Sequence, residues 1–140
     1  MSLWELPASS IFLDGMAIAA MLVYAPFLIV AYGRLKVGYD LGAPRAMFEK
    51  LPDYAKRATW AHQNSFETFI LFASASFMAY LTHQDSVLAV GAVVAFLIGR
   101  FLYSIFYILD VPIARSLMFA ISSSGTAILF ILSLISVNNF

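Results

Sequence analysis

The chain has 140 residues, of which 62% are hydrophobic and only 11% are charged, with a formal net charge of +0. Apolar residues make up about half of a soluble domain, so this composition excludes a soluble protein and predicts an all-α integral membrane protein. The absence of cysteine excludes disulfides and thiolate nucleophiles, and two distant histidines predict no metal site. The sequence has no cluster of basic and aromatic residues outside the apolar runs, so nothing in it indicates a nucleic-acid partner.

Four apolar runs, at about 11–36, 57–83, 86–109 and 113–137, reach the length that crosses a bilayer, which is about 20 residues for a core of ~30 Å. They predict a four-transmembrane-helix, up-down bundle in which residues 1–140 form a single membrane domain. The first loop, roughly 37–54, contains glycines and prolines and is expected to be irregular. The second loop, around 82–86, is short and predicts an antiparallel hairpin. Pro112 suits the first turn of the last helix, and Gly125 offers a small-residue surface for helix packing.

The positive charges are distributed on one side of the predicted topology. The N-terminus, the second loop and the C-terminus contain no Lys or Arg. By the positive-inside rule, loops one and three are expected to be cytoplasmic and both termini non-cytoplasmic. The basic residues occupy the first loop, the third loop and the adjoining helix ends: Arg34, Lys36, Arg45, Lys50, Lys56, Arg57, Arg100 and Arg115.

Two of the apolar runs carry polar side chains on one helical face. Arg57, Asn64 and Glu67 recur at helical spacing in the second run, and an ionisable residue inside a membrane is a functional-site hypothesis. Arg100 lies in the third run, about 15 Å from its cytoplasmic end, at the depth that Glu67 has in the second. The two are therefore predicted to form an ion pair. A purely architectural role, locking two helices, is the alternative interpretation.

The functional interpretation is a polar pocket open to the cytoplasm. Asn64, Tyr103 and Tyr107 are expected to line it, because they lie toward the cytoplasm on the same helical faces. Several cations combined with amide and phenol groups suit an anionic, peptide-like ligand. Arg115 adds a cation at a helix N-terminus, where the helix dipole also favours an anion. Ser116 is interpreted either as a contributing hydroxyl or as an ordinary first-turn residue. Three cations converge on this side, namely Arg34, Arg57 and Arg115.

The chain resembles the MAPEG superfamily of membrane-associated proteins in eicosanoid and glutathione metabolism, and in particular its little-characterised bacterial-type branch. The similarity rests on three motifs. They are the pattern of Arg, Ala, His, Asn and Glu over residues 57–67, Gly99-Arg100 followed by Tyr103 and Tyr107, and Arg115-Ser116 at the start of the last helix. The resemblance implies a homotrimer with glutathione bound between neighbouring subunits near the cytosolic face. It implies that glutathione is held by a set of residues that comprises Arg34, Asn64, Glu67, Tyr103, Tyr107 and Arg115, with Arg115 stabilising the thiolate and Ser116 as an alternative activator.

The leading hypothesis is a glutathione-dependent membrane transferase or peroxidase acting on a lipophilic electrophile or a lipid hydroperoxide. Glutathione or another low-molecular-weight thiol would come from the cytosol, and the second substrate from the membrane lipid. A non-catalytic lipid-binding or scaffold protein of the same family is the main alternative. A transporter or channel is a third, which four spans and charges near one face disfavour.

Overall fold

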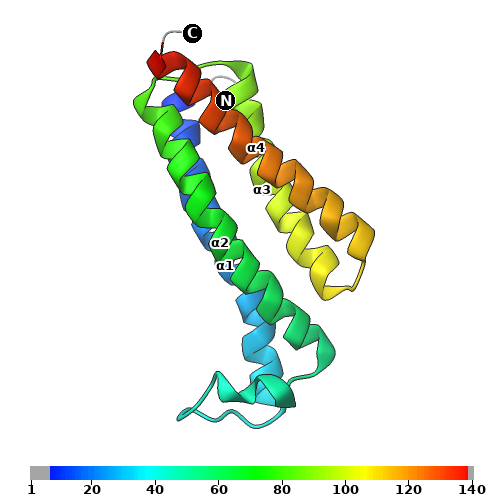
Figure 1. Cartoon of the computed structure of the whole chain (residues 1–140). Helices are drawn as coiled ribbons and strands as arrows, with labels where there is room; N and C mark the ends of the chain where they lie inside the picture. Colours follow the sequence, from blue (N-terminus) through cyan, green and yellow to red (C-terminus); the bar gives the residue numbers. More distant parts are fainter. Residues whose placement is uncertain (1–6, 139–140) are drawn as a thin grey trace.

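The structure is a computed structural model that describes residues 7–138. The described chain comprises α1 (Ala8–Lys36), the short 3-10 helix η2 (Ala46–Lys50), α2 (Asp53–Leu81), α3 (Val87–Ile108) and α4 (Pro112–Asn138) (Figure 1). The four long helices follow the four predicted runs, and α4 begins at Pro112 as expected. η2 has no counterpart among the predicted elements.

α2 differs most from its predicted bounds, because it begins at Asp53 rather than near residue 57. Its first turns are amphipathic, so an apolar run does not mark where the helix starts. α1, α3 and α4 are long and apolar enough to cross a membrane, and together they identify an integral membrane protein. Charged and amide side chains lower the hydropathy of α2, so it stays a prediction that α2 also crosses the membrane.

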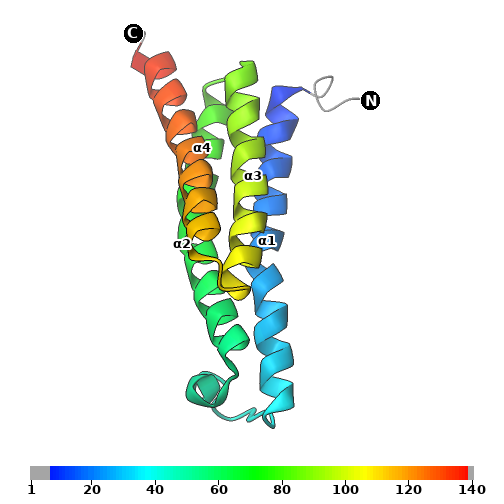
Figure 2. The same cartoon turned by 90° about the vertical axis from the view of Figure 1, so that its right-hand side faces the viewer.

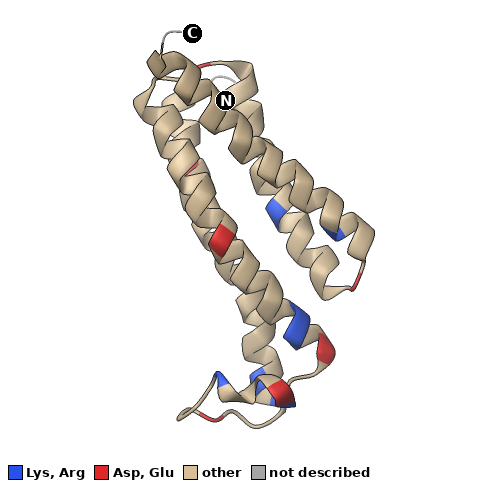
Figure 3. Cartoon of the chain, in the orientation of Figure 1, with Lys and Arg blue, Asp and Glu red and all other residues tan. Residues whose placement is uncertain are grey.

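The helices alternate in direction. The start of α1, the turn at 82–86 and the end of α4 lie at one end of the bundle, as Figures 1 and 2 both show. The α1–α2 connection and the α3–α4 turn lie toward the other end, where α1 and α2 extend well beyond α3 and α4. Figure 3 shows Lys and Arg from the middle of the molecule to the end that holds the α1–α2 connection, and none among the described residues near the end where α1 starts and α4 ends. The structure thus places the basic residues on one side, and which side faces the cytoplasm stays a prediction.

Small residues allow α3 and α4 to pack closely. A Cβ atom added at Gly125 would lie 2.6 Å from the carbonyl oxygen of Ala92, and one at Gly99 would lie 3.1 Å from the Cβ of Ser122. Only glycine permits this approach at Gly125. The predicted small-residue packing surface is therefore confirmed.

Aromatic stacking joins α3 to α2, and a side-chain cap stabilises the start of α3. The rings of Phe72 in α2 and Phe96 in α3 stack with a centroid separation of 3.7 Å. The N-terminus of α3 is capped by Ser86, whose Oγ accepts the N–H of Ala89 at 3.1 Å. The stack joins α2 to α3, and the close packing at Gly99 and Gly125 joins α3 to α4, beside the polar residues described next.

Candidate functional site

A pocket of about 300 Å³ lies where α2, α3 and α4 meet near the α3–α4 turn. We call it the α4 pocket. α3 contributes two tyrosines four residues apart on one face, and α4 contributes the residues of its first two turns. The lining residues are Asn64, Tyr103, Tyr107, Arg115, Ser116 and Phe119. The structure thus brings together Asn64, both tyrosines, Arg115 and Ser116, which were all predicted as site residues.

Arg115 is the cation of the α4 pocket. Its guanidinium carbon lies 4.6 Å from the centroid of the Tyr107 ring, a cation–π distance. The Tyr107 ring in turn meets Tyr103 edge to face, at 5.5 Å and 74°. Within residues 7–138 the ion pairs are Lys56–Glu49 and Arg57–Asp110, so no described carboxylate neutralises Arg115. A free cation at the N-terminus of α4 favours an anion in this pocket.

Arg100 contacts two residues that line the α4 pocket and does not line the pocket itself. It is buried, with 3% of its surface exposed, and its Nη2 donates to Asn64 Oδ1 at 3.0 Å and to Ser65 Oγ at 3.1 Å. Its guanidinium carbon also lies 4.0 Å from the centroid of Tyr103. Because an arginine only donates, Asn64 accepts through its oxygen and keeps its NH₂ group for another partner. Arg100 therefore orients Asn64 and Tyr103 without lining the pocket.

The predicted ion pair between Glu67 and Arg100 is wrong for the single chain. Arg100 bonds to Asn64 and Ser65 instead, and Glu67 is exposed on the outer surface of α2. Equal depth along two helices does not determine rotation about their axes. At 100° per residue, Glu67 lies about 200° around α2 from the buried Ser65 that faces α3.

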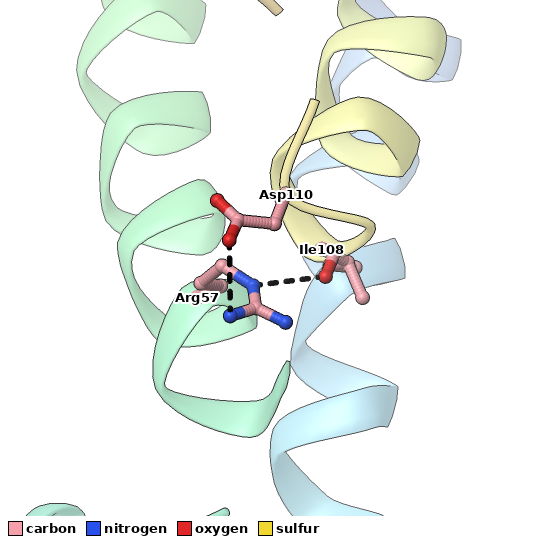
Figure 4. A network of polar contacts seen from close by, with 3 residues as sticks. All are labelled: Arg57, Ile108 and Asp110. Carbon is pink, nitrogen blue, oxygen red and sulfur yellow. Dashed lines mark hydrogen bonds and ion pairs between the residues drawn. The ribbon is translucent and has the colours of Figure 1, made fainter. Parts of the chain in front are cut away.

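Arg34 and Arg57 lie outside the α4 pocket. Arg34 lines a second pocket of about 800 Å³ between α1, the first connection and α2, and its Nε is buried without a hydrogen-bond partner among the described residues. Arg57 donates from Nε to the carbonyl of Ile108 at 3.0 Å, and its Nη1 lies 3.8 Å from Asp110 Oδ2 (Figure 4). One chain therefore does not gather every predicted ligand, and their roles toward a ligand stay predictions.

Some residues near the site were not predicted from the sequence. Ser65 lies next to Asn64 rather than three or four residues from it, so helical spacing does not mark it as a site residue. Phe119 carries no polar group to mark it, although its spacing from Arg115 and Ser116 places it on the pocket face. His62 does not line the α4 pocket and packs against α1, where its Nδ1 donates to the carbonyl of Val23 at 2.7 Å.

These features define an α-helical integral membrane protein with a cationic, phenol-lined pocket near one end of its helices. The MAPEG family model matches residues 12–135. The chain therefore belongs to the MAPEG family, which includes glutathione transferases and peroxidases as well as non-catalytic members. Comparison with curated proteins gives no match, and neither does comparison with solved structures.

Proposed function

We propose that this protein is a glutathione-dependent membrane transferase or peroxidase that acts on a lipophilic electrophile or a lipid hydroperoxide. The observation that carries the proposal is the α4 pocket, in which the unneutralised Arg115 meets amide, phenol and hydroxyl groups. Family members commonly use glutathione, and its carboxylates and thiolate suit these partners. Another low-molecular-weight thiol would fit the same chemistry.

In the proposed mechanism, Arg115 stabilises the thiolate of glutathione, while Asn64 and the tyrosines bind its peptide groups. The sulfur then forms a bond to the electrophilic carbon, and the leaving group departs with the bonding electrons. With a hydroperoxide, the thiolate sulfur bonds to the terminal oxygen as the O–O bond breaks, which gives glutathione sulfenic acid and a lipid alkoxide that takes up a proton. A second glutathione then forms the disulfide and releases water. The rate gain comes from positioning and from electrostatic stabilisation of the thiolate.

Assembly as a homotrimer, with glutathione between subunits, is part of this proposal. Arg34 lies in a different pocket of the single chain, and Glu67 lies on its outer surface. A carboxylate facing lipid from within a transmembrane helix is costly, which supports a neighbouring subunit covering it. A neighbour would then supply the predicted ligands that one chain leaves outside the α4 pocket.

A separate groove, lined by residues of α3 and α4, favours the second candidate function, a non-catalytic lipid-binding or scaffold protein. The groove has a volume of about 680 Å³ and is lined mainly by apolar and small residues, including Gly91, Ala95 and Ala120. A lipid acyl chain suits such a surface. In this candidate the α4 pocket binds no thiol.

Thiol binding separates the two candidates. Purified protein in lipid nanodiscs is titrated with glutathione by calorimetry and assayed with a chloronitrobenzene and with a lipid hydroperoxide. S-methylglutathione, which cannot form a thiolate, is the control. The transferase proposal expects saturable glutathione binding and thiol-dependent turnover that the methylated control does not support. Lipid retention without thiol binding or turnover would favour the scaffold.

A further inference from the structure

The C-terminus of α3 ends in a Schellman motif in which the left-handed residue is not glycine. The N–H of Val111 donates to Phe106 O at 2.9 Å and the N–H of Asp110 donates to Tyr107 O at 3.2 Å. Asp110 has a φ of 61°, a conformation that costs a residue with a Cβ more than it costs glycine. The motif satisfies the carbonyls of Phe106 and Tyr107 and leaves that of Ile108 to find another donor.

Arg57 supplies that donor from the start of α2. Its Nε donates to Ile108 O at 3.0 Å, while its Nη1 lies 3.8 Å from the carboxylate of Asp110. Figure 4 shows the guanidinium between the end of α3 and the residue that turns toward α4. The side chain of Arg57 thus caps the C-terminus of α3 and pairs with Asp110, the residue in the left-handed conformation. We call this group the Arg57 clamp, consisting of Arg57, Ile108 and Asp110.

The clamp is linked to both walls of the α4 pocket. Asn64 lies seven residues beyond Arg57 on nearly the same face of α2, about 10 Å along the axis. On the other side, only residues 109–111 separate α3 from α4. The N–H of Arg115 donates to Val111 O at 3.0 Å, so Arg115 lies in the first turn of α4 and moves with the α3–α4 turn.

We propose that Arg57 is a positioning residue that sets the separation of Arg115 from Asn64 across the α4 pocket, instead of contacting the thiol substrate itself. Its guanidinium already has two partners in the chain, and it does not line that pocket. The consequence for thiol chemistry rests on the proposed function. The effect on helix separation does not.

Distance measurement by double electron–electron resonance tests the separation directly. The chain has no cysteine, so nitroxide labels can be attached at Asp53→Cys in α2 and at Ile113→Cys in α4, where Ile113 is 86% exposed. Doubly labelled chains are diluted with unlabelled chains so that the distances report on one chain. Arg57→Met removes both contacts of the clamp. Lys56→Met is the matched control, because it removes an adjacent cation whose ion pair with Glu49 does not involve α3 or α4.

We expect Arg57→Met to broaden or lengthen the 53–113 distance distribution and Lys56→Met to leave it unchanged. Arg57→Lys should restore part of the narrow distribution, since it keeps the charge facing Asp110. In the glutathione assay, Arg57→Met should lower kcat/KM by about 10-fold to 100-fold, because small displacements of positioning groups cost this much. The fall should appear mainly in kcat, and the absorbance of bound thiolate should weaken.

An unchanged distribution in Arg57→Met would overturn the proposal, and a large loss of glutathione affinity alongside it would make Arg57 a direct ligand. If Arg57→Met does not fold, Asp110→Asn replaces it, since asparagine tolerates the left-handed conformation and removes the charge. This variant should broaden the distribution to a lesser degree, and no change would again contradict the clamp. A broadened distribution in a protein that binds no thiol would support the clamp and refute the proposed function.

Discussion

Arg115 is the residue on which the proposed chemistry depends. We expect Arg115→Ala to lower turnover of a model electrophile by an order of magnitude or more. Loss of one preorganised donor typically costs about 2.7 to 4 kcal/mol. Arg115→Lys should recover only part of the rate, because a point charge replaces a planar guanidinium that rests on the Tyr107 ring. Steady-state kinetics measure both changes. A wild-type rate in Arg115→Ala would remove Arg115 from the mechanism.

Ser116 lines the same pocket and is the other candidate for activating the thiol. Ser116→Ala removes the hydroxyl and leaves the guanidinium in place. If Arg115 stabilises the thiolate, this variant should keep most of the turnover, with a rate within a few-fold of the wild type in the same assay. A fall to the level of Arg115→Ala would instead assign thiol activation to the hydroxyl.

The sequence predicts which residues line the site more readily than it predicts which side chains bond to one another. Helical spacing places polar residues of one helix on a shared face. The residues that meet in the α4 pocket in this way are Asn64, Tyr103, Tyr107, Arg115 and Ser116. The partner of Arg100 was predicted incorrectly, since depth along a helix does not determine rotation about it. Burial of Ser65 against α3 decided that rotation, and such packing is decided by neighbouring helices.

At the scale of elements, close packing of α3 on α4 depends on Gly125. Gly125→Ala should destabilise the protein by about 1 to 3 kcal/mol, the usual cost of overpacking, because the new Cβ would lie 2.6 Å from Ala92 O. Gly91→Ala is the matched control, since a Cβ there meets nothing within 4 Å and alanine favours the helix. Denaturation in mild detergent measures both. Equal stability of the two variants would contradict the packing described here.

The four long helices were predictable because apolar runs of that length have few alternatives in a bilayer. Their ends were less predictable. α2 extends back to Asp53 through amphipathic turns that follow Pro52, and η2 forms in a segment with no apolar periodicity. In these segments packing against α1 decides the structure, since Leu51 and Ala55 are buried in one cluster with Val30 of α1.

At the scale of the whole molecule, the distribution of charge predicts the orientation in the membrane. No Lys or Arg of the described chain lies near the end where α1 starts and α4 ends, so the positive-inside rule places the α1–α2 connection and the α3–α4 turn on the cytoplasmic side. A reporter fused after Phe140 should therefore be active only outside the cytoplasm, and one inserted in the first loop only within it. A cytoplasmic signal at the C-terminus would refute both the orientation and a pocket supplied from the cytosol.

The assembly is the part that the sequence pattern predicts least directly. Arg34 and Glu67 lie outside the α4 pocket of the single chain, so their predicted contact with glutathione depends on the proposed trimer. Contacts between chains depend on surface shape, which periodicity within one chain does not encode.

Ultraviolet difference spectroscopy tests the central claim, that Arg115 holds a glutathione thiolate in the α4 pocket. Purified protein in nanodiscs is titrated with glutathione near neutral pH, and the spectrum with S-methylglutathione is subtracted. We predict a saturable thiolate absorption band in the wild type that is lost in Arg115→Ala and retained in Ser116→Ala. Absence of the band in the wild type at saturating glutathione, or its persistence in Arg115→Ala, would contradict the account.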